Sequence, residues 1–120
     1  MNSINNLNNV DKGKIGEIIA AKYLTLKVVK VIDKNYKNRF GEIDIIGKLE
    51  NKILFVEVKS RTSKNYGLAC EAVNSNKIKK ITSVAKYYIM VNNLKNCEVR
   101  FDVVEIYFDE EVINHIEDAF

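Results

Sequence analysis

The sequence contains no proline, two cysteines and a single histidine among its 120 residues. Without proline, turns must rely on asparagine, aspartate and glycine residues. The two cysteines, Cys70 and Cys97, lack the spacing of cysteine ligands in metal sites, so a structural zinc site of that type is excluded. The one histidine, His115, lies near the C-terminus, and a histidine-based catalytic site is not expected.

Long apolar runs are also missing, because the longest unbroken aliphatic segments are about four residues, far short of a membrane span. The first residues carry neither a charged nor an apolar region of the signal-peptide kind. We therefore expect a cytoplasmic protein that is not bound to a membrane, with both thiols reduced.

The composition indicates an ordinary globular protein, with 47% hydrophobic and 29% charged residues. The length suggests one domain. Residues 1–9 are rich in asparagine and are predicted to be a disordered leader, followed by a single domain over residues 10–120. The net charge of +3, from 19 basic and 16 acidic residues, does not by itself establish nucleic-acid binding.

Two neighbouring segments place charged residues where an apolar core is expected. Residues 41–46 read Gly-Glu-Ile-Asp-Ile-Ile, and residues 53–61 read Ile-Leu-Phe-Val-Glu-Val-Lys-Ser-Arg. Side chains alternate along a strand, so Glu57 and Lys59 share one face. A buried carboxylate needs a compensating charge, which a divalent metal can supply. Asp44, which twelve residues separate from Glu57, has the spacing expected if two antiparallel strands form one metal site.

This constellation suits phosphodiester cleavage with Mg²⁺ or Mn²⁺ as the cofactor. Mg²⁺ prefers oxygen ligands, usually one or two carboxylates with substrate phosphate, and can generate the attacking hydroxide. Lys59 could orient the water, help to deprotonate it, or stabilise the transition state. The alternative is that Glu57 and Lys59 form a solvated pair on a half-exposed sheet, contributing less than about 1 kcal/mol.

The pattern predicts a helix over residues 10–27 with Asn9 as N-cap, then strands over 28–36, 42–48 and 52–60. A second helix is expected over 76–91, capped by Asn74 or Ser75, and a fourth strand over 98–108, parallel to the third. Residues 109–120 are expected to add a short strand or turn. In the first helix, the apolar positions include Ile15, Ile18, Ile19, Leu24 and Leu26. The order αβββαβ is an α/β sandwich around a mixed sheet.

With these two segments and the further residues named below, the chain resembles the YraN-like family of small bacterial proteins. This family is placed in the PD-(D/E)XK nuclease superfamily, near the archaeal Holliday junction resolvases. The resemblance runs from about residue 12 to 120. Its residues are Gly16-Glu17, Ala20, Tyr23-Leu24, Asn35, the 41–46 segment, Phe55-Val56-Glu57-Val58-Lys59, Arg61, Gly67, Glu71-Ala72-Val73, Lys77, Arg100 to Val104 and Ala119-Phe120. Ile43 stands where the superfamily name has proline, a position loosely held in that superfamily.

The resemblance implies a restriction-endonuclease-like sandwich, with the mixed sheet flanked by helices, and a nuclease-like site. Asp44 and Glu57 are the expected metal ligands, Lys59 the catalytic lysine, and the backbone carbonyl of Val58 a third ligand. Glu17 lies on a small apolar helix face with Gly13, Ala20, Ala21 and Leu24. It is either a residue at the rim of that face or, as the resemblance favours, an additional catalytic carboxylate that helps the metal.

Four residues are candidates for nucleic-acid binding. Arg61, Lys64 and Tyr66 follow the catalytic strand and either hold phosphates or belong to an ordinary solvated loop. Lys77 opens the second helix and resembles a supporting polar residue of related nucleases. Lys79, Lys80 and Lys86 are interpreted as a solvated helix face. Arg100 and Asp102 share a strand face, and we expect a structural pair.

The leading hypothesis is a metal-dependent endonuclease acting on DNA rather than RNA; the preference for branched DNA rests on the similarity to junction resolvases. The alternative is a non-catalytic or partner-dependent nucleic-acid-binding protein on the same fold. A third option is an interaction protein whose sheet carries an incidental charged face. A homodimer would allow two sites to act on two strands of a junction, although no residue fixes the oligomeric state.

Overall fold

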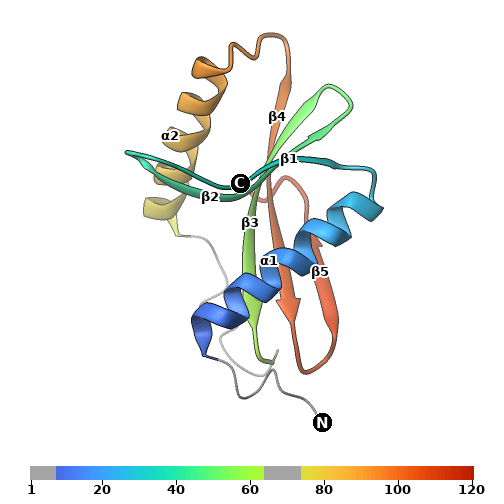
Figure 1. The fold of residues 1–120 in the computed structure, drawn as a ribbon. Helices are drawn as coiled ribbons and strands as arrows, with labels where there is room; N and C mark the ends of the chain where they lie inside the picture. The colour runs from blue at the N-terminus through green and yellow to red at the C-terminus, as the bar shows by residue number, and fades with distance from the viewer. Residues whose placement is uncertain (1–7, 64–73) are drawn as a thin grey trace.

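A computed structural model describes residues 8–63 and 74–120 as a five-stranded sheet with two helices. Figure 1 shows the arrangement, with α1 and α2 on different sides of the sheet. The elements are α1 (Asn9–Leu26), β1 (Lys30–Asn38), β2 (Gly41–Leu49), β3 (Lys52–Arg61), α2 (Ser75–Val91), β4 (Glu98–Tyr107) and β5 (Val112–Ile116).

The strands follow one another in chain order, with β3 at the centre. β3 and β4 pair in parallel, and the other neighbouring strands pair antiparallel. The sheet is therefore mixed, and the predicted α/β class and the order αβββαβ are confirmed, with β5 as the short strand expected in the tail. The arrangement is consistent with the restriction-endonuclease-like fold.

Each face of the sheet has its own apolar core, because side chains alternate along the strands. The core under α1 contains Ala20, Leu24, Val29, Ile45, Leu54, Val56, Val104, Ile106 and Phe108. The core under α2 contains Ile43, Ile46, Ile53, Phe55, Ile81, Val84, Ala85 and Tyr88. β3 contributes to both cores. Its even-numbered residues, such as Leu54 and Val56, face α1, and its odd-numbered residues, such as Ile53 and Phe55, face α2.

The boundaries of α1 differ from the prediction at both ends. Asn8, not Asn9, is the N-cap, and its side chain accepts the backbone N–H of Asp11 at 2.8 Å. At the other end, Val28 has a φ of 60°, which lies outside the range of regular strand backbone. The N–H of Val29 still bonds to the Leu24 carbonyl at 3.0 Å. The first strand therefore starts at Lys30 rather than at residue 28.

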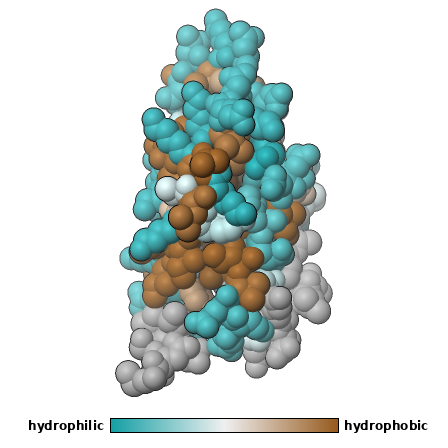
Figure 2. Space-filling model, turned by 90° about the vertical axis from the view of Figure 1, so that its right-hand side faces the viewer, coloured by the Kyte–Doolittle hydropathy of each residue, from teal (hydrophilic) through white to brown (hydrophobic). Residues whose placement is uncertain are grey.

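The α1 helix does not bury all the apolar side chains that its sequence offers. Ile18 is exposed and Leu26 is 85% exposed, contrary to their predicted place among the apolar positions of the helix. Figure 2, which views the molecule from the right-hand side of Figure 1, shows apolar side chains gathered on that face. The buried stripe consists of the smaller Gly16 and Ala20 with Leu24, because these residues let the helix approach the sheet closely.

The closest approach is between Gly16 of α1 and Ser60 of β3. A Cβ atom placed on Gly16 would lie 1.8 Å from the Ser60 Oγ atom, which is far inside contact distance. The Ser60 hydroxyl is buried and has no hydrogen-bond partner among the described residues. Glycine at position 16 therefore sets the distance between α1 and the central strand.

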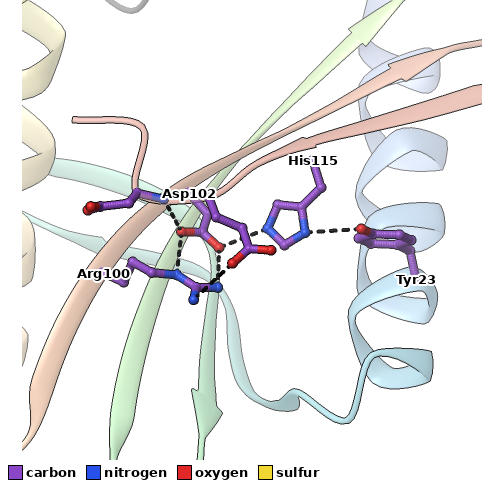
Figure 3. A network of polar contacts seen from close by, with 6 residues as sticks. Tyr23, Arg100, Asp102 and His115 are labelled. Atoms are coloured by element: carbon purple, nitrogen blue, oxygen red, sulfur yellow. Dashed lines mark hydrogen bonds and ion pairs between the residues drawn. The ribbon is translucent and has the colours of Figure 1, made fainter.

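A buried polar network ties the C-terminal segment to the α1 side of the sheet (Figure 3). Arg100 donates two hydrogen bonds of 2.9 Å to Asp102, which is fully buried. The His115 Nε2 atom lies 2.8 Å from Asp102 Oδ2, and its Nδ1 atom lies 3.0 Å from the Tyr23 hydroxyl. The backbone N–H of Asp118 also donates to Asp102 at 3.0 Å. The predicted structural pairing of Arg100 with Asp102 is confirmed.

Burial alone would raise the pKa of Asp102. The hydrogen bonds from Arg100, Asp118 and His115 outweigh that effect, and they hold the pKa below its ordinary value. The carboxylate is thus ionised and fully partnered, as a buried charge must be.

The sequence led us to expect no membrane-spanning segment and reduced cysteines, and both expectations bear on the described residues. Neither α1 nor α2, the helices in the described part of the chain, is long and apolar enough to cross a membrane. Cys97 is a free thiol, whereas Cys70 lies outside the described residues.

Candidate metal centre

The β2–β3 ladder ends at the point where the predicted carboxylates stand. Its last pair joins Ile45 with Val56, and Asp44 and Glu57 are the next residue on each strand. Beyond that pair, the Asp44 side chain takes the place of a backbone partner, because its Oδ2 atom accepts the N–H of Val58 at 2.8 Å. The two carboxylates therefore lie where β2 and β3 stop pairing and a gap between the two strands begins.

The β2 strand changes its alternation at Asp44. Ile43 packs in the core under α2, whereas Ile45, two residues later, packs in the core under α1. Opposite this point, Asn35 of β1 has a φ of 54° and separates the pairs Lys34 with Ile45 and Tyr36 with Ile43. Irregularities of this kind re-aim a side chain, and here the side chain is that of Asp44.

Asp44 is held in an environment that disfavours its charge. Burial, then a hydrogen bond with Glu57 and the charge of Glu57, raise the pKa of Asp44 to about 8, and the charge of Glu17 adds to the effect. The N–H of Val58 works in the opposite direction. Asp44 thus keeps its proton near neutral pH, because an ionised Asp44 would be buried beside the charges of Glu57 and Glu17.

Glu57 is 7% exposed and contacts the ammonium group of Lys77 at the start of α2. Asn74 caps this helix, as expected, by accepting the N–H of Lys77 at 2.8 Å, so the cap holds Lys77 where it meets β3. Lys77 supplies one positive charge to the carboxylate pair. The contact places Lys77 beside the carboxylate pair, and its expected role in supporting the site and binding nucleic acid stays a prediction.

Lys59 and Arg61 continue the line that begins with Glu57. Residues 53 and 55 of β3 lie in the core under α2, so residues 57, 59 and 61 lie on the same face. In the parallel β3–β4 pair, Lys59 stands opposite Glu105. The predicted grouping of Glu57 with Lys59 on one face therefore agrees with the register of the sheet.

Glu105 is a residue that the sequence reasoning missed. It is buried, and its Oε1 atom accepts a hydrogen bond of 2.7 Å from Asn114 of β5. The signal was present in the sequence, because Glu105 interrupts an apolar run of β4 in the same way that Glu57 interrupts β3. It adds a second buried carboxylate, after Glu57, to the sheet face that carries Lys59.

The remaining predicted residues fall into three groups. Glu17 is half-buried on α1 and acts on Asp44 through its charge. Val58 uses its N–H toward Asp44, and the N–H and C=O of one strand residue point to the same side, so the Val58 carbonyl also faces the gap. Lys64 and Tyr66 lie outside the described residues.

The donor atoms of Asp44, Glu57 and the Val58 carbonyl are all oxygen, the type that Mg²⁺ and Mn²⁺ take. In residues 8–63 and 74–120, no group of three histidine, cysteine or acidic side chains is arranged to hold a metal. Mg²⁺ usually binds one or two protein carboxylates and keeps several waters. The pair of Asp44 and Glu57 fits that requirement, since a cation would replace the proton that Asp44 holds.

Comparisons with known proteins place the chain in a family. The family model described as "Uncharacterised protein family UPF0102" matches residues 16–106, a span that includes Glu17, Asp44, Glu57 and Lys59. A UPF0102 protein of Clostridioides difficile is 53% identical over 114 residues, which cover 95% of this chain and all of that protein.

Two further relatives are similarly close over their whole length. A UPF0102 protein of Caldanaerobacter subterraneus is 45% identical over 119 residues, covering 95% of this chain and 98% of that protein. A UPF0102 protein of Clostridium beijerinckii is 47% identical over 116 residues, covering 93% of this chain and 94% of that protein. The chain therefore belongs to the UPF0102 family, as its resemblance to YraN-like proteins predicted.

Proposed function

We propose that this protein is a metal-dependent nuclease that hydrolyses phosphodiester bonds in DNA. The observation that supports the proposal is the carboxylate pair of Asp44 and Glu57, which meets where the β2–β3 ladder ends and in which burial and Glu57 raise the pKa of Asp44 to about 8. Two adjacent, largely buried carboxylates with no ligand to bind would be costly, whereas a site that receives a cation needs carboxylates that can release a proton to it.

Each side chain of the site has a role in this proposal. Asp44, Glu57 and the Val58 carbonyl would hold Mg²⁺ or Mn²⁺, with Glu17 as a nearby carboxylate that acts directly or through water. A bound divalent metal polarises the phosphoryl group and lowers the pKa of a coordinated water. Lys59 lies beside Glu57 on the same strand face, where its ammonium group can orient the attacking water or balance the charge that develops on phosphorus.

Two more groups complete the site. Lys77 neutralises Glu57 in the free protein and is placed to contact a substrate phosphate when a metal takes over that charge. Arg61, at the end of β3, extends the basic side of the site, and Lys64 and Tyr66 are proposed to continue it.

The substrate preference and the assembly are also part of the proposal. DNA with a branch or another departure from the duplex is favoured by the similarity to junction resolvases. A homodimer would allow the two strands of a branch to be cut together.

One observation favours an alternative in which the protein binds nucleic acid and cuts only with a partner. Lys77 already contacts Glu57, and Asp44 holds a proton near neutral pH, so the free site is electrically balanced without a metal. On this alternative, binding weakens with ionic strength, and no metal supports cleavage by the isolated protein.

The experiment that tests the proposal is a cleavage assay with a panel of substrates. Wild-type and Lys59→Ala proteins are incubated with labelled single-stranded, duplex, flap and four-way-junction DNA and with one structured RNA, in Mg²⁺ and then in Mn²⁺. Cutting by the wild type alone supports the nuclease and ranks its substrates. Equal cutting by both proteins would mean that another site or a contaminant is responsible.

A further inference from the structure

The tip of the β1–β2 hairpin carries an aromatic and basic surface that lies apart from the candidate metal centre. Arg39 and Phe40 form the turn, and Tyr87 of α2 lies beside them, with ring centroids of Phe40 and Tyr87 6.2 Å apart and tilted by 60°. Figure 1 shows the hairpin tip beside α2. The resulting hairpin groove, of about 290 Å³, is lined by Arg39, Phe40, Ser83, Lys86, Tyr87 and Met90.

The local fold fixes this turn against the helix. Asn38 accepts the backbone N–H of Phe40 through its Oδ1 atom at 2.9 Å, a contact that sets the turn. Gly41 has a φ of 149°, and a Cβ atom there would lie 3.5 Å from the Val84 side chain. The aromatic ring of Phe40 is therefore presented by a turn that is seated on α2, which reduces the entropy lost on binding a ligand.

The chemistry of the hairpin groove favours nucleic acid over other ligands. Phe40 is 39% exposed and Met90 is 66% exposed, so apolar surface is open to solvent. The guanidinium carbon of Arg39 lies 4.9 Å from the centre of the Phe40 ring, and Lys86 adds a second exposed cation. None of the six described lining residues is acidic. Aromatic rings flanked by cations are the features that stack bases and hold phosphates.

The hairpin groove is also at a useful distance from the candidate metal centre. Phe40, in the turn just before β2, precedes Asp44 by four residues, which corresponds to about 13 Å in extended backbone. Lys77, which contacts Glu57, precedes Tyr87 by ten residues on α2, or about 15 Å along a helix. Both paths give a similar separation, roughly the length of four stacked nucleotides at 3.4 Å each.

We propose that Phe40 and Tyr87, flanked by Arg39 and Lys86, stack an unpaired nucleobase of the nucleic-acid substrate a few nucleotides from the candidate metal centre. This inference rests on the proposed function for its substrate. It assigns to the hairpin groove the recognition of unpaired bases, which a branch, flap or single strand offers and a perfect duplex does not. Phosphates on either side of the base would be held by Arg39 and Lys86.

The test measures binding rather than cleavage, with metal removed by EDTA. The probe is DNA that carries one 2-aminopurine base, either in an unpaired stretch or within a duplex of the same sequence. Wild-type protein is compared with Phe40→Leu, which keeps an apolar side chain, with Phe40→Tyr, which keeps a ring, and with Tyr87→Ala. Leu26→Ala is the matched control, because Leu26 is 85% exposed at the end of α1. Thermal unfolding of each variant checks that it folds.

We expect wild type and Phe40→Tyr to bind the unpaired probe with a change in 2-aminopurine fluorescence. Phe40→Leu and Tyr87→Ala should bind roughly tenfold more weakly, in line with the loss of one stacked base, and should lose that change. Leu26→Ala should behave as wild type. Arg39→Ala should reduce the slope of log affinity against log salt concentration by about one, which is the effect of losing one phosphate contact.

Wild-type affinity in a folded Phe40→Leu variant, or no binding of the unpaired probe by the wild type, would overturn the inference. Failure of the proposed function gives a different result, because a protein that cuts no DNA can still bind the unpaired probe through Phe40. Conversely, cleavage of branched DNA that is unchanged in Phe40→Leu, together with unchanged binding, removes the stacking role and leaves the nuclease intact.

Discussion

The ammonium group of Lys77 contacts the carboxylate of Glu57 across the interface between α2 and β3. This contact links the cap of a helix to the centre of the sheet, since Asn74 holds the backbone N–H of Lys77. It gives the Glu57 carboxylate a positive partner that a divalent cation would have to replace.

Removal of Lys77 should therefore strengthen metal binding. In Lys77→Met, we expect the affinity for Mn²⁺ to rise by about tenfold, because one hydrogen bond to a charged group, worth about 1.5 kcal/mol, no longer competes. Isothermal titration calorimetry measures the change. Lys79→Met is the control, since Lys79 is exposed on the same helix and has no place in the site. Weaker Mn²⁺ binding by Lys77→Met than by Lys79→Met would contradict this reading of the contact.

The raised pKa of Asp44 predicts a pH-dependent metal affinity. Folded Asp44 titrates at about 8 and unfolded aspartate near about 3.9, so a proton must leave when the metal binds below pH 8. The affinity should rise by up to about tenfold per pH unit and level off above pH 8. Calorimetry in buffers of different ionisation enthalpy counts the released proton. An affinity that is independent of pH between 6 and 8 would show that Asp44 is not a ligand.

The same shift has a consequence for the protein without metal. Between about pH 4 and pH 8 the folded state holds a proton that the unfolded chain has lost, so the free energy of unfolding falls as the pH rises through this range. Asp44→Asn removes the titrating group, and the variant should lose that part of the pH dependence. Urea unfolding of both proteins at pH 5 and pH 8 makes the comparison.

The buried network around Asp102 predicts a large loss of stability when one partner is removed. Asp102→Ala should lower the free energy of unfolding by about 3–5 kcal/mol, because it removes the buried carboxylate that partners both Arg100 and His115. Glu117→Ala should cost less than about 1 kcal/mol, since Glu117 is 62% exposed although it also pairs with Arg100. Urea unfolding at neutral pH separates the two results, and similar losses in both variants would be contrary to the account.

The pH dependence of Asp102 has the opposite sign to that of Asp44. Its pKa lies below the ordinary value in the folded state. The contribution of Asp102 to stability is therefore present above about pH 3.9 and is lost as the pH falls through the folded pKa. Acid unfolding of the wild type should reflect this group, and Asp102→Asn should remove that part of the acid transition.

Two glycines of α1 should respond in opposite directions to the same substitution. Gly16→Ala places a methyl group against Ser60 and should destabilise the fold by about 1–3 kcal/mol. Gly13→Ala meets nothing within 4 Å and should stabilise the helix by about 0.5–1 kcal/mol. Thermal unfolding of the two variants gives the signs, and a stabilised Gly16→Ala would mean that α1 can move away from β3.

The sequence predicted those features that depend on periodicity within one element. Alternation along β3 separates Glu57 and Lys59 from the core under α1, and this is visible in the residues alone. The cap at Asn74 and the parallel return of β4 followed from local signals and chain order. Asp44 was found by its spacing from Glu57, because a hairpin brings two such positions together.

Features that depend on tertiary contacts were not predicted. The exposure of Leu26 follows from the close approach of Gly16 to Ser60, which directs a narrow stripe of α1 toward the sheet. The contact between Lys77 and Glu57 joins residues of different elements, and the partnership of His115 with Asp102 requires the β4–β5 register. Val28 adopts a positive φ, although valine rarely does. The start of β1 at Lys30 could therefore not be predicted from the preference of valine for strands.

The most direct test of the account is the rate of DNA cleavage by Glu57→Gln in Mn²⁺, measured in single turnover on the best substrate of the wild type. Glu42→Gln, at an exposed acidic residue of β2, is the control. Loss of several kcal/mol of transition-state stabilisation predicts a rate about a thousandfold lower for Glu57→Gln, with folding intact and Glu42→Gln near wild type. Cleavage at the wild-type rate by folded Glu57→Gln would contradict the account.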